Sequence, residues 1–254
     1  MYNIIHGSYP KYKEELQYLE DLSSLYHYTN IGGVLGILNT GSIWLTNVKT
    51  ANDFSEGRII LEKSFSEGKT RKELVKLLLN NLYTCSFTTN GNMLSQWRSY
   101  GDVAIGFDYS SIQNSQRLLR DASNNDYDLD TSGTQFGLCE YVDIGNDNEL
   151  RAYISAVNKY ENLFKNDKFQ DKQRALLSIG SICFNLKHVG FYEEKEARVF
   201  SYLWNKSPKY NGKTKYIEYK IESQNVKEII IGPSKHKDEN LRDLADLNLP
   251  LMVE

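Results

Sequence analysis

Strand-like and helix-like segments are segregated along this chain, and that segregation limits the folds that it can adopt. Near the end of the chain, three segments rich in β-branched and aromatic residues follow one another at 195–203, 215–221 and 226–231. They come after a region, 147–189, whose apolar pattern predicts two consecutive helices. A doubly wound parallel sheet requires strands and helices that alternate. The sequence therefore predicts an α+β fold.

The remaining segments are assigned from their apolar periodicity and turn residues. We expect strands at 24–29, 43–45, 82–88, 103–108 and 136–144, and helices at 11–24, 54–65, 71–82, 93–101, 238–247 and in the residues just before Gly41. The polar segment 110–135 is predicted to be a loop or a weak helix. No linker rich in proline or glycine divides the chain, so we expect a single domain over 1–254.

Charge, cysteine content and hydropathy argue against several classes of protein. The net charge is −3, so no basic excess favours broad binding of nucleic acid, although a local basic groove is compatible with it. The cysteines, Cys85, Cys139 and Cys183, form no CxxC or Cys/His cluster, so neither a disulfide framework nor a metal site is expected. No signal-peptide core and no membrane-spanning run occur. We therefore expect a cytoplasmic protein with no membrane partner.

The common nucleotide-binding and hydrolase motifs are absent from this sequence or incomplete in it. The segment 68–70, "GKT", suggests a phosphate loop, but Lys63 replaces the glycine that such a loop needs five residues earlier. No GxGxxG segment follows a strand, and neither GxSxG nor HExxH occurs. Four histidines are present, which limits histidine-based chemistry to His6, His27, His188 and His236.

The segment "EEKEARVF", residues 193–200, carries the most suggestive pattern of charges. In a strand, Glu194, Glu196 and Arg198 share one face, whereas Ala197 and Val199 share the other. One interpretation is an antiparallel strand with a solvated charged face. The other is a pair of carboxylates that lines a cleft, with Arg198 holding one of them ionised.

Several other residues admit both a structural and a ligand-binding interpretation. His27 ends a predicted strand between two tyrosines, where a core or surface histidine is also common. Ser86 and Thr88 alternate on the strand 82–88, as hydroxyl residues also do on ordinary exposed strands. Asn52 and Asp53 either cap the following helix or contact a ligand.

The segment "LSQWRSYG" offers aromatic rings and a cation within one turn of helix. Trp97, Arg98 and Tyr100 either pack in the helix and leave a surface charge, or they wall a pocket. In a pocket, an aromatic residue would lie against a ring, and Arg98 would bind a phosphate.

In their order along the chain, these segments resemble a bacterial family designated domain of unknown function 2971. The matching segments are "LYHYT", "IWLTNVKTANDFSEG", "CSFTTNGNMLSQWRSYGDVAIGFD", "YEEKEARVF" and "EIIIGP", and the resemblance spans roughly residues 25–235. That family is in turn similar to the ADP-ribosyltransferase fold. The resemblance implies two packed, mainly antiparallel sheets that form a central cleft and are flanked by helices. It divides the chain into an N-terminal helical extension (1–24), a core (25–235) and a C-terminal segment (236–254).

The resemblance also implies roles for individual residues. Glu196 would be the catalytic member of a Glu-x-Glu motif, Glu194 would orient or deprotonate the nucleophile, and Arg198 would keep a carboxylate ionised. His27 would bind a ribose hydroxyl group of NAD. The other implied cofactor-binding residues are Tyr28, Thr29, Asn52, Asp53, Ser86, Thr88, Trp97, Arg98 and Tyr100.

The implied function is NAD-dependent transfer of ADP-ribose to a macromolecule, in a bacterial toxin or phage-defence effector that an antitoxin or inhibitor protein would restrain. NAD would be a substrate, and no metal is expected. The alternatives are an NAD glycohydrolase and a non-catalytic module that senses a nucleotide or binds a partner. The acceptor is expected to be a protein, with RNA or DNA as the alternative because the segment Lys206–Lys215 combines lysines with a tyrosine.

Overall fold

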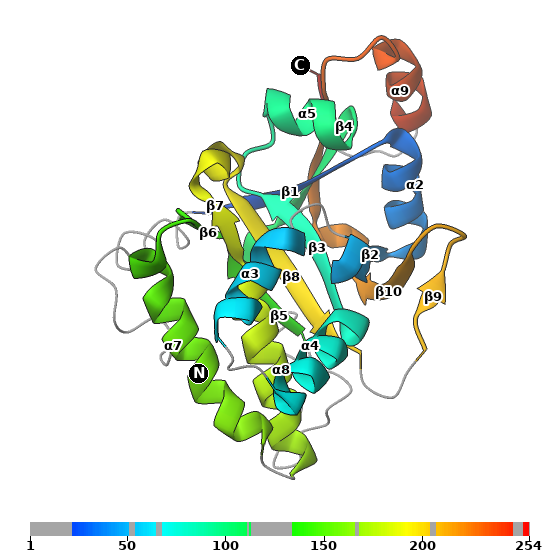
Figure 1. Ribbon diagram of the computed structural model, residues 1–254. Helices are drawn as coiled ribbons and strands as arrows, with labels where there is room; N and C mark the ends of the chain where they lie inside the picture. Colours follow the sequence, from blue (N-terminus) through cyan, green and yellow to red (C-terminus); the bar gives the residue numbers. More distant parts are fainter. Residues whose placement is uncertain are drawn as a thin grey trace.

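The computed structural model describes residues 22–50, 54–64, 68–110, 112, 134–165, 168–203, 207–245 and 251–253 (Figure 1). The predicted helix over 11–24 and the polar segment 110–135 lie almost entirely outside these residues. Within them, the α+β class and the mainly antiparallel pairing of the strands are confirmed.

The central strand of the sheet is β3 (Leu82–Thr88), and the sheet branches at this strand. Along one edge, β3 pairs over its whole length with β8 (Glu196–Tyr202), which pairs in turn with β5 (Thr134–Leu138). Along the other edge, the first half of β3 pairs with β2 (Ser42–Asn47), and its last residue pairs with β1 (Ser24–Thr29). The sheet therefore forks into two arms, and both arms are attached to β3.

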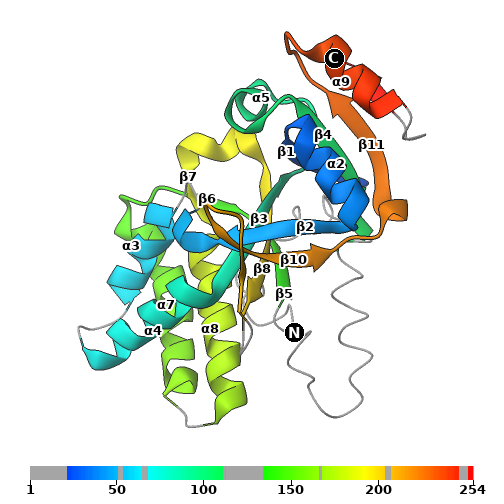
Figure 2. The same ribbon diagram turned by 90° about the vertical axis from the view of Figure 1, so that its right-hand side faces the viewer.

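Each arm continues away from β3 through further strands (Figure 2). The first arm runs from β1 through β4 (Val103–Asp108) and β11 (Val226–Ile231) to β12 (Leu251–Val253), and the second runs from β2 through β10 (Lys215–Lys220) to β9 (Lys209–Tyr210). A separate parallel pair consists of β6 (Glu140–Val142) and β7 (Leu186–His188). The prediction of two packed sheets is thus corrected to two arms of one hydrogen-bonded sheet.

Apolar side chains fill the space between the two arms. Leu45 on β2, Phe87 on β3 and Ile105 on β4 belong to one buried cluster, to which α2 (Ile31–Thr40) and α9 (Lys237–Leu244) also contribute. Both arms turn their apolar faces toward this core, and the burial of that apolar surface holds the arms together.

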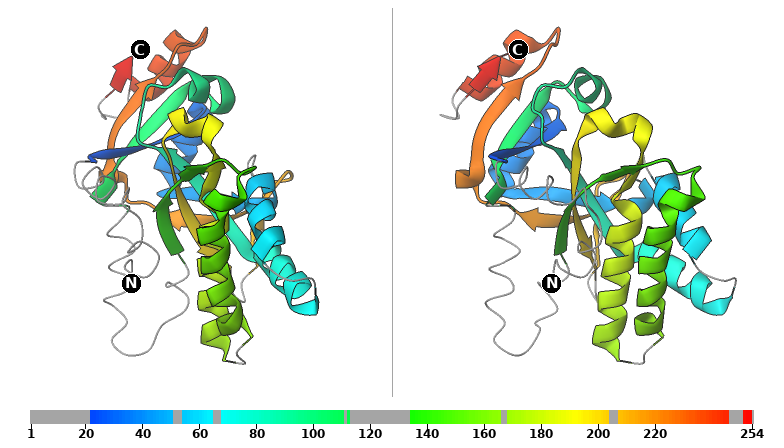
Figure 3. Two further views of the ribbon diagram at one scale, coloured as in Figure 1. Left: turned by 60° about the vertical axis from the view of Figure 1, so that its left-hand side comes forward. Right: turned by 90° about the vertical axis from the view of Figure 1, so that its left-hand side faces the viewer.

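A helical layer covers the opposite face of β3 and β8 (Figures 1 and 3). Its members are α3 (Phe54–Ser64), α4 (Lys69–Asn81), α7 (Asp147–Phe164) and α8 (Phe169–Phe184). They enclose a second apolar core, in which Phe200 and Tyr202 of β8 are buried. No helix in the described ranges is long and apolar enough to span a membrane.

Local sequence signals explain the elements that the sequence predicted well. The side chain of Asn30 accepts a hydrogen bond from the N–H group of Gly33 and caps the start of α2. Gly41 ends α2 with a φ angle of 57°, in the left-handed region that glycine adopts without strain. By contrast, the single strand predicted over 136–144 is interrupted at Cys139, and its halves, β5 and β6, belong to different sheets.

Candidate functional site

Two acidic and two basic side chains meet at the start of β8, and we call Lys187, Glu194, Glu196 and Arg198 the carboxylate cluster. The Lys187 ammonium group donates hydrogen bonds to Oε2 of Glu194 and, at 2.7 Å, to Oε2 of Glu196. The Arg198 guanidinium group donates to Glu196 from Nε at 2.6 Å and from Nη2 at 3.0 Å. Glu196 is thus paired with two cations and Glu194 with one.

Three of the four residues of the carboxylate cluster are removed from water, which strengthens the electrostatic interactions among them. Lys187 is 1% exposed, Arg198 4% and Glu196 6%. Burial alone would raise the pKa of the Glu196 carboxyl group, but the ion pairs with Arg198 and Lys187 outweigh it and lower this pKa from 4.5 to about 2. Glu196 is therefore ionised throughout the physiological pH range.

Neighbouring elements hold the cluster through further polar contacts. The hydroxyl oxygen of Tyr141 on β6 accepts a 2.7 Å hydrogen bond from the backbone N–H group of Glu196. The backbone carbonyl of Phe184, the last residue of α8, accepts a hydrogen bond from Arg198 Nη1. The Phe191 ring lies over the Lys187 ammonium group, with 5.3 Å between Nζ and the ring centroid. The frame around the cluster thus comes from β6, β7, α8 and the segment before β8.

The backbone around Glu194 differs from the prediction of one continuous strand. Glu194 is the last residue of a 3₁₀ helix, η4 (Val189–Glu194), and β8 begins only at Glu196. Lys195 joins them with a φ angle of 42°, in the left-handed region. The two carboxylates meet because this turn folds η4 back over the start of the strand, and not because they alternate along it.

The orientation of β8 confirms one part of the prediction and corrects another. Ala197 and Val199 are buried in the core between the arms, as expected. The face that bears Glu196 and Arg198 was expected to line a cleft, but it lies beneath α8 and β7. The reason is that the same face continues into Phe200, which packs in the core of the helical layer.

His27 lies where the sheet forks. Its Nδ1 atom is 3.0 Å from the backbone carbonyl oxygen of Ser86, in the part of β3 between the residues that pair with β2 and β1. Because a carbonyl only accepts hydrogen bonds, Nδ1 carries the proton and Nε2 is the acceptor of the neutral ring. Burial lowers the pKa of His27 below its usual 6.5, so the ring is neutral at pH 7.

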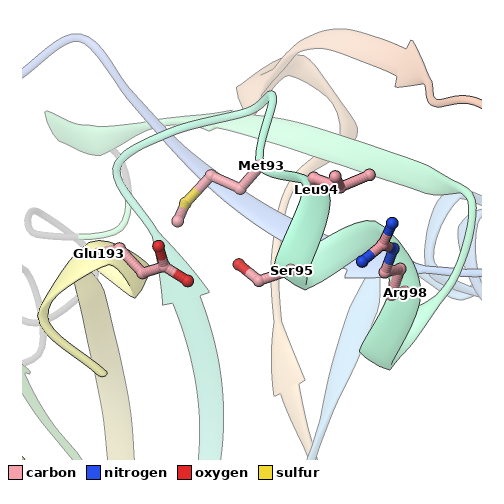
Figure 4. A pocket seen from close by; sticks show the side chains of 5 residues that line it. All are labelled: Met93, Leu94, Ser95, Arg98 and Glu193. Carbon is pink, nitrogen blue, oxygen red and sulfur yellow. The ribbon is translucent and has the colours of Figure 1, made fainter. Parts of the chain in front are cut away.

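A hollow of about 380 Å³ lies beside η4, and its lining includes Glu193 but none of the four residues of the carboxylate cluster (Figure 4). Glu193 of η4 forms one wall, and Leu94, Ser95 and Arg98 of α5 (Leu94–Tyr100) form the other, with Met93 between them. Glu193 and Arg98 are both exposed, and neither forms an ion pair with another residue that the structure describes. The hollow therefore presents an unpaired anion and an unpaired cation on facing walls.

Three buried side chains pack against the residues around the hollow: Tyr28, Trp97 and Thr88. The Tyr28 hydroxyl group accepts a 2.9 Å hydrogen bond from the backbone N–H group of Met93, and its ring packs edge-on against Trp97. Trp97 is 7% exposed, so it does not offer its face to a ligand ring as the sequence suggested. Thr88 donates a hydrogen bond to the backbone carbonyl of Glu194 and links the hollow to the cluster.

The other predicted residues are not brought into this group. Thr29 packs against Gly33 at the start of α2. Ser86 is exposed on β3, opposite Arg198 in the strand register, and Tyr100 is exposed but does not line the hollow. Asn52 and Asp53 lie outside the described residues. Within the described ranges, no three His, Cys, Asp or Glu residues are grouped to hold a metal ion.

Sequence reasoning missed Lys187, Tyr141 and Glu193. Lys187 lies in a three-residue strand between a helix and a turn, where neither periodicity nor a motif distinguishes it from a surface lysine. Glu193 could have been found, because it directly precedes the two glutamates that were singled out. Nothing in the sequence around Tyr141 identifies it as a site residue, because its contact with Glu196 depends on the pairing of β6 with β7.

These features define an α+β protein with a branched, mainly antiparallel sheet and a largely buried carboxylate cluster. Residues 96–199 match the model of a family described as "Protein of unknown function (DUF2971)". The match runs from α5 to β8, so it includes Arg98 and the whole carboxylate cluster but not His27. No curated protein matches the chain significantly.

Proposed function

We propose that this protein transfers ADP-ribose from NAD to a macromolecular acceptor, at the hollow beside the carboxylate cluster. One observation carries the proposal: Tyr26, Thr88 and Glu196 lie opposite one another on β1, β3 and β8. The three candidate motifs, which lie far apart in the sequence, thus belong to three neighbouring strands. These strands carry the neutral His27, the hydroxyl residue Thr88 and the carboxylate Glu196, and Glu194 precedes β8 at the end of η4.

The reaction needs a carboxylate more than it needs a proton donor. The bond between C1′ of the ribose and the nicotinamide nitrogen breaks, and nicotinamide leaves with the bonding electrons. Positive charge then develops on C1′ and the ring oxygen, as in glycoside hydrolysis. An ionised carboxylate near the ribose stabilises that charge. A nucleophilic atom of the acceptor forms the new bond to C1′ and gives up its proton to a base.

The hollow supplies complementary groups for the rest of the dinucleotide. Arg98 is positioned on α5 to bind a phosphate oxygen, and Glu193 to accept hydrogen bonds from hydroxyl or amide groups across the hollow. His27 does not line the hollow, and its ring centroid lies 5.8 Å from that of Phe87; the order of the motifs, and not this geometry, assigns its acceptor nitrogen Nε2 to a ribose hydroxyl group. These roles use groups without an ion-pair partner among the residues that the structure describes.

A protein is the favoured acceptor. The lysine-bearing hairpin of β9 and β10 lies at the end of the second arm, and β2 and β3 separate it from β8. Lys209, moreover, forms an ion pair with Glu218, which reduces the charge available for phosphates. Lys206 lies outside the described residues. RNA or DNA is the alternative acceptor.

The test uses NAD labelled in its adenylate part, incubated with the purified protein and a bacterial lysate. We expect nicotinamide release and label in the protein fraction, and a loss of both in Arg98→Ala because NAD binds more weakly. Lys76→Ala on the exposed side of α4 is the matched control. Label in RNA or DNA would replace the protein acceptor, and nicotinamide release without any labelled macromolecule would indicate a glycohydrolase.

A non-catalytic nucleotide-binding module is the second candidate function. The observation that favours it is the full pairing of Glu196 with two cations, because such a carboxylate is costly to redirect toward a substrate. Calorimetry that detects NAD binding without nicotinamide release would favour this module over the transferase.

A further inference from the structure

The two glutamates of the carboxylate cluster differ in the oxygen atoms that remain available. Both oxygens of Glu196 accept hydrogen bonds, Oε1 from Arg198 and Oε2 from Lys187 and Arg198. Glu194 accepts through Oε2 from Lys187, and its Oε1 has no partner among the residues that the structure describes. The side chain of Glu194 is 15% exposed and that of Glu196 is 7% exposed. Glu194 alone can meet a ligand without first breaking a buried ion pair.

Lys187 determines where the carboxylate of Glu194 lies. Its ammonium group bridges Glu194 and Glu196 and is enclosed by the ring of Phe191, so it has little freedom to move. The two cations balance the two carboxylates within the cluster. Without Glu196, the two buried cations would share the single negative charge of Glu194, so Glu196 is needed as a counter-anion.

We infer that Glu194 is the carboxylate that contacts the ribose of bound NAD, that Lys187 is its positioning residue, and that Glu196 is an internal counter-anion. The identity of the ligand in this inference rests on the proposed function, whereas the difference between the two glutamates rests on the geometry. The assignment reverses the roles that the Glu-x-Glu pattern implies for the pair.

The first test does not depend on activity. A water-soluble carbodiimide with an amine converts accessible carboxyl groups of the folded wild-type protein into amides, which peptide mass spectrometry locates. We expect modification of Glu194 but not of Glu196, and slower modification of Glu194 in the presence of NAD. Exposed Glu73 on α4 is the control, and its rate should not change with NAD. Equal modification of both glutamates, or a Glu194 rate that bound NAD leaves unchanged, would overturn the inference.

The second test measures nicotinamide release. Glu194→Gln should reduce the rate about 100-fold or more in protein that is still folded, as for loss of one electrostatic stabiliser. Its melting temperature should fall less than that of Glu196→Gln, because Lys187 and Arg198 both keep Glu196 as a partner. Lys187→Met should also lower the rate, because Glu194 loses the cation that positions it, and Lys187→Arg should restore the rate. If Lys187→Met does not fold, the charge-balanced double variant Lys187→Met/Glu194→Gln should fold better than it.

The outcomes separate the inference from the proposed function. A folded Glu194→Gln variant with wild-type activity would overturn the assignment while leaving the transferase intact. Wild-type protein that releases no nicotinamide would remove the proposed transferase. In that case the carbodiimide pattern alone decides which glutamate faces a ligand.

Discussion

The hydroxyl group of Thr88 donates a 2.7 Å hydrogen bond to the backbone carbonyl of Glu194, and this contact joins the end of β3 to the end of η4. The same hydroxyl oxygen accepts a 3.2 Å hydrogen bond from the N–H group of Asn90. Thr88 is 2% exposed. One buried side chain therefore holds both the segment that carries Glu194 and the loop that leads to α5.

Replacing Thr88 by valine keeps the shape of the side chain and removes these two hydrogen bonds, together with a 3.6 Å contact between the hydroxyl group and Met93 Sδ. Because backbone groups of Glu194 and Asn90 lose their partner, the free energy of unfolding should fall by about 1–3 kcal/mol. Thr46→Val is the matched control, since the Thr46 hydroxyl group makes a longer contact of 3.5 Å with the Thr84 carbonyl. Urea unfolding measures the free energy of unfolding of the two variants. Equal decreases in Thr88→Val and Thr46→Val would contradict a special role for Thr88.

Glu196→Gln tests the burial of the carboxylate cluster. We expect the free energy of unfolding to fall by about 3 kcal/mol, because Lys187 and Arg198 stay buried with less negative charge. Glu73→Gln on exposed α4 should change stability by less than about 0.5 kcal/mol. A Glu196→Gln variant as stable as this control would refute the ion pairing.

The pKa of Glu196 also predicts how stability depends on pH. The folded-state pKa of about 2 lies below the unfolded value of 4.5, so the stabilisation is complete above pH 4.5 and is lost as the pH falls through 2. The difference corresponds to about 3 kcal/mol. Unfolding measured between pH 5 and pH 2 should show this loss in the wild type and a shallower slope in Glu196→Gln. Parallel curves would assign the acid sensitivity to other carboxylates.

His27 should bind a ligand as a neutral ring. Its NMR titration should have a midpoint below pH 6.5, because burial disfavours the charged form. His27→Ala should lower the melting temperature, through loss of the contact with Ser86, and should also weaken NAD binding measured by calorimetry. Unchanged NAD affinity in the folded variant would define His27 as a core histidine.

Two helical glycines give a prediction about packing that is independent of function. A Cβ atom on Gly57 of α3 would approach the ring of Phe184 to 2.5 Å, so Gly57→Ala should destabilise the contact between α3 and α8. Gly36 of α2 has nothing within 4 Å of the same position, so Gly36→Ala should stabilise the protein by about 0.5–1 kcal/mol. Urea unfolding of the two variants should give changes of opposite sign.

The features that the sequence predicted well are those with local causes. The limits of α2 follow from Asn30 and Gly41, which act within a few residues. The alternation in β8 correctly predicted that Ala197 and Val199 are buried, because side-chain direction in a strand depends only on position. These signals do not depend on which strands are neighbours.

The features that were missed depend on partners far away in the sequence. The interruption at Cys139 follows from the pairing of β6 with β7, which lies beyond two helices. The burial of Glu196 depends on Lys187, which reaches it only because β7 returns to the start of β8. Alternation along a strand shows which side chains share a face, but not whether water or a helix covers that face.

The branching of the sheet at β3 has a consequence for the order of folding. Thr88 and Glu194 are 106 residues apart in the sequence, so the pairing of β3 with β8 closes a long loop that contains α7 and α8. Contacts across such a loop form slowly, because the chain entropy is lost before they stabilise anything. During synthesis on the ribosome, the first four strands, β1 to β4, emerge well before β8. Until β8 emerges, the edge of β3 that pairs with β8 in the folded protein has no strand partner. The carboxylate cluster is thus completed late, and a nascent chain has no site until β8 is in place.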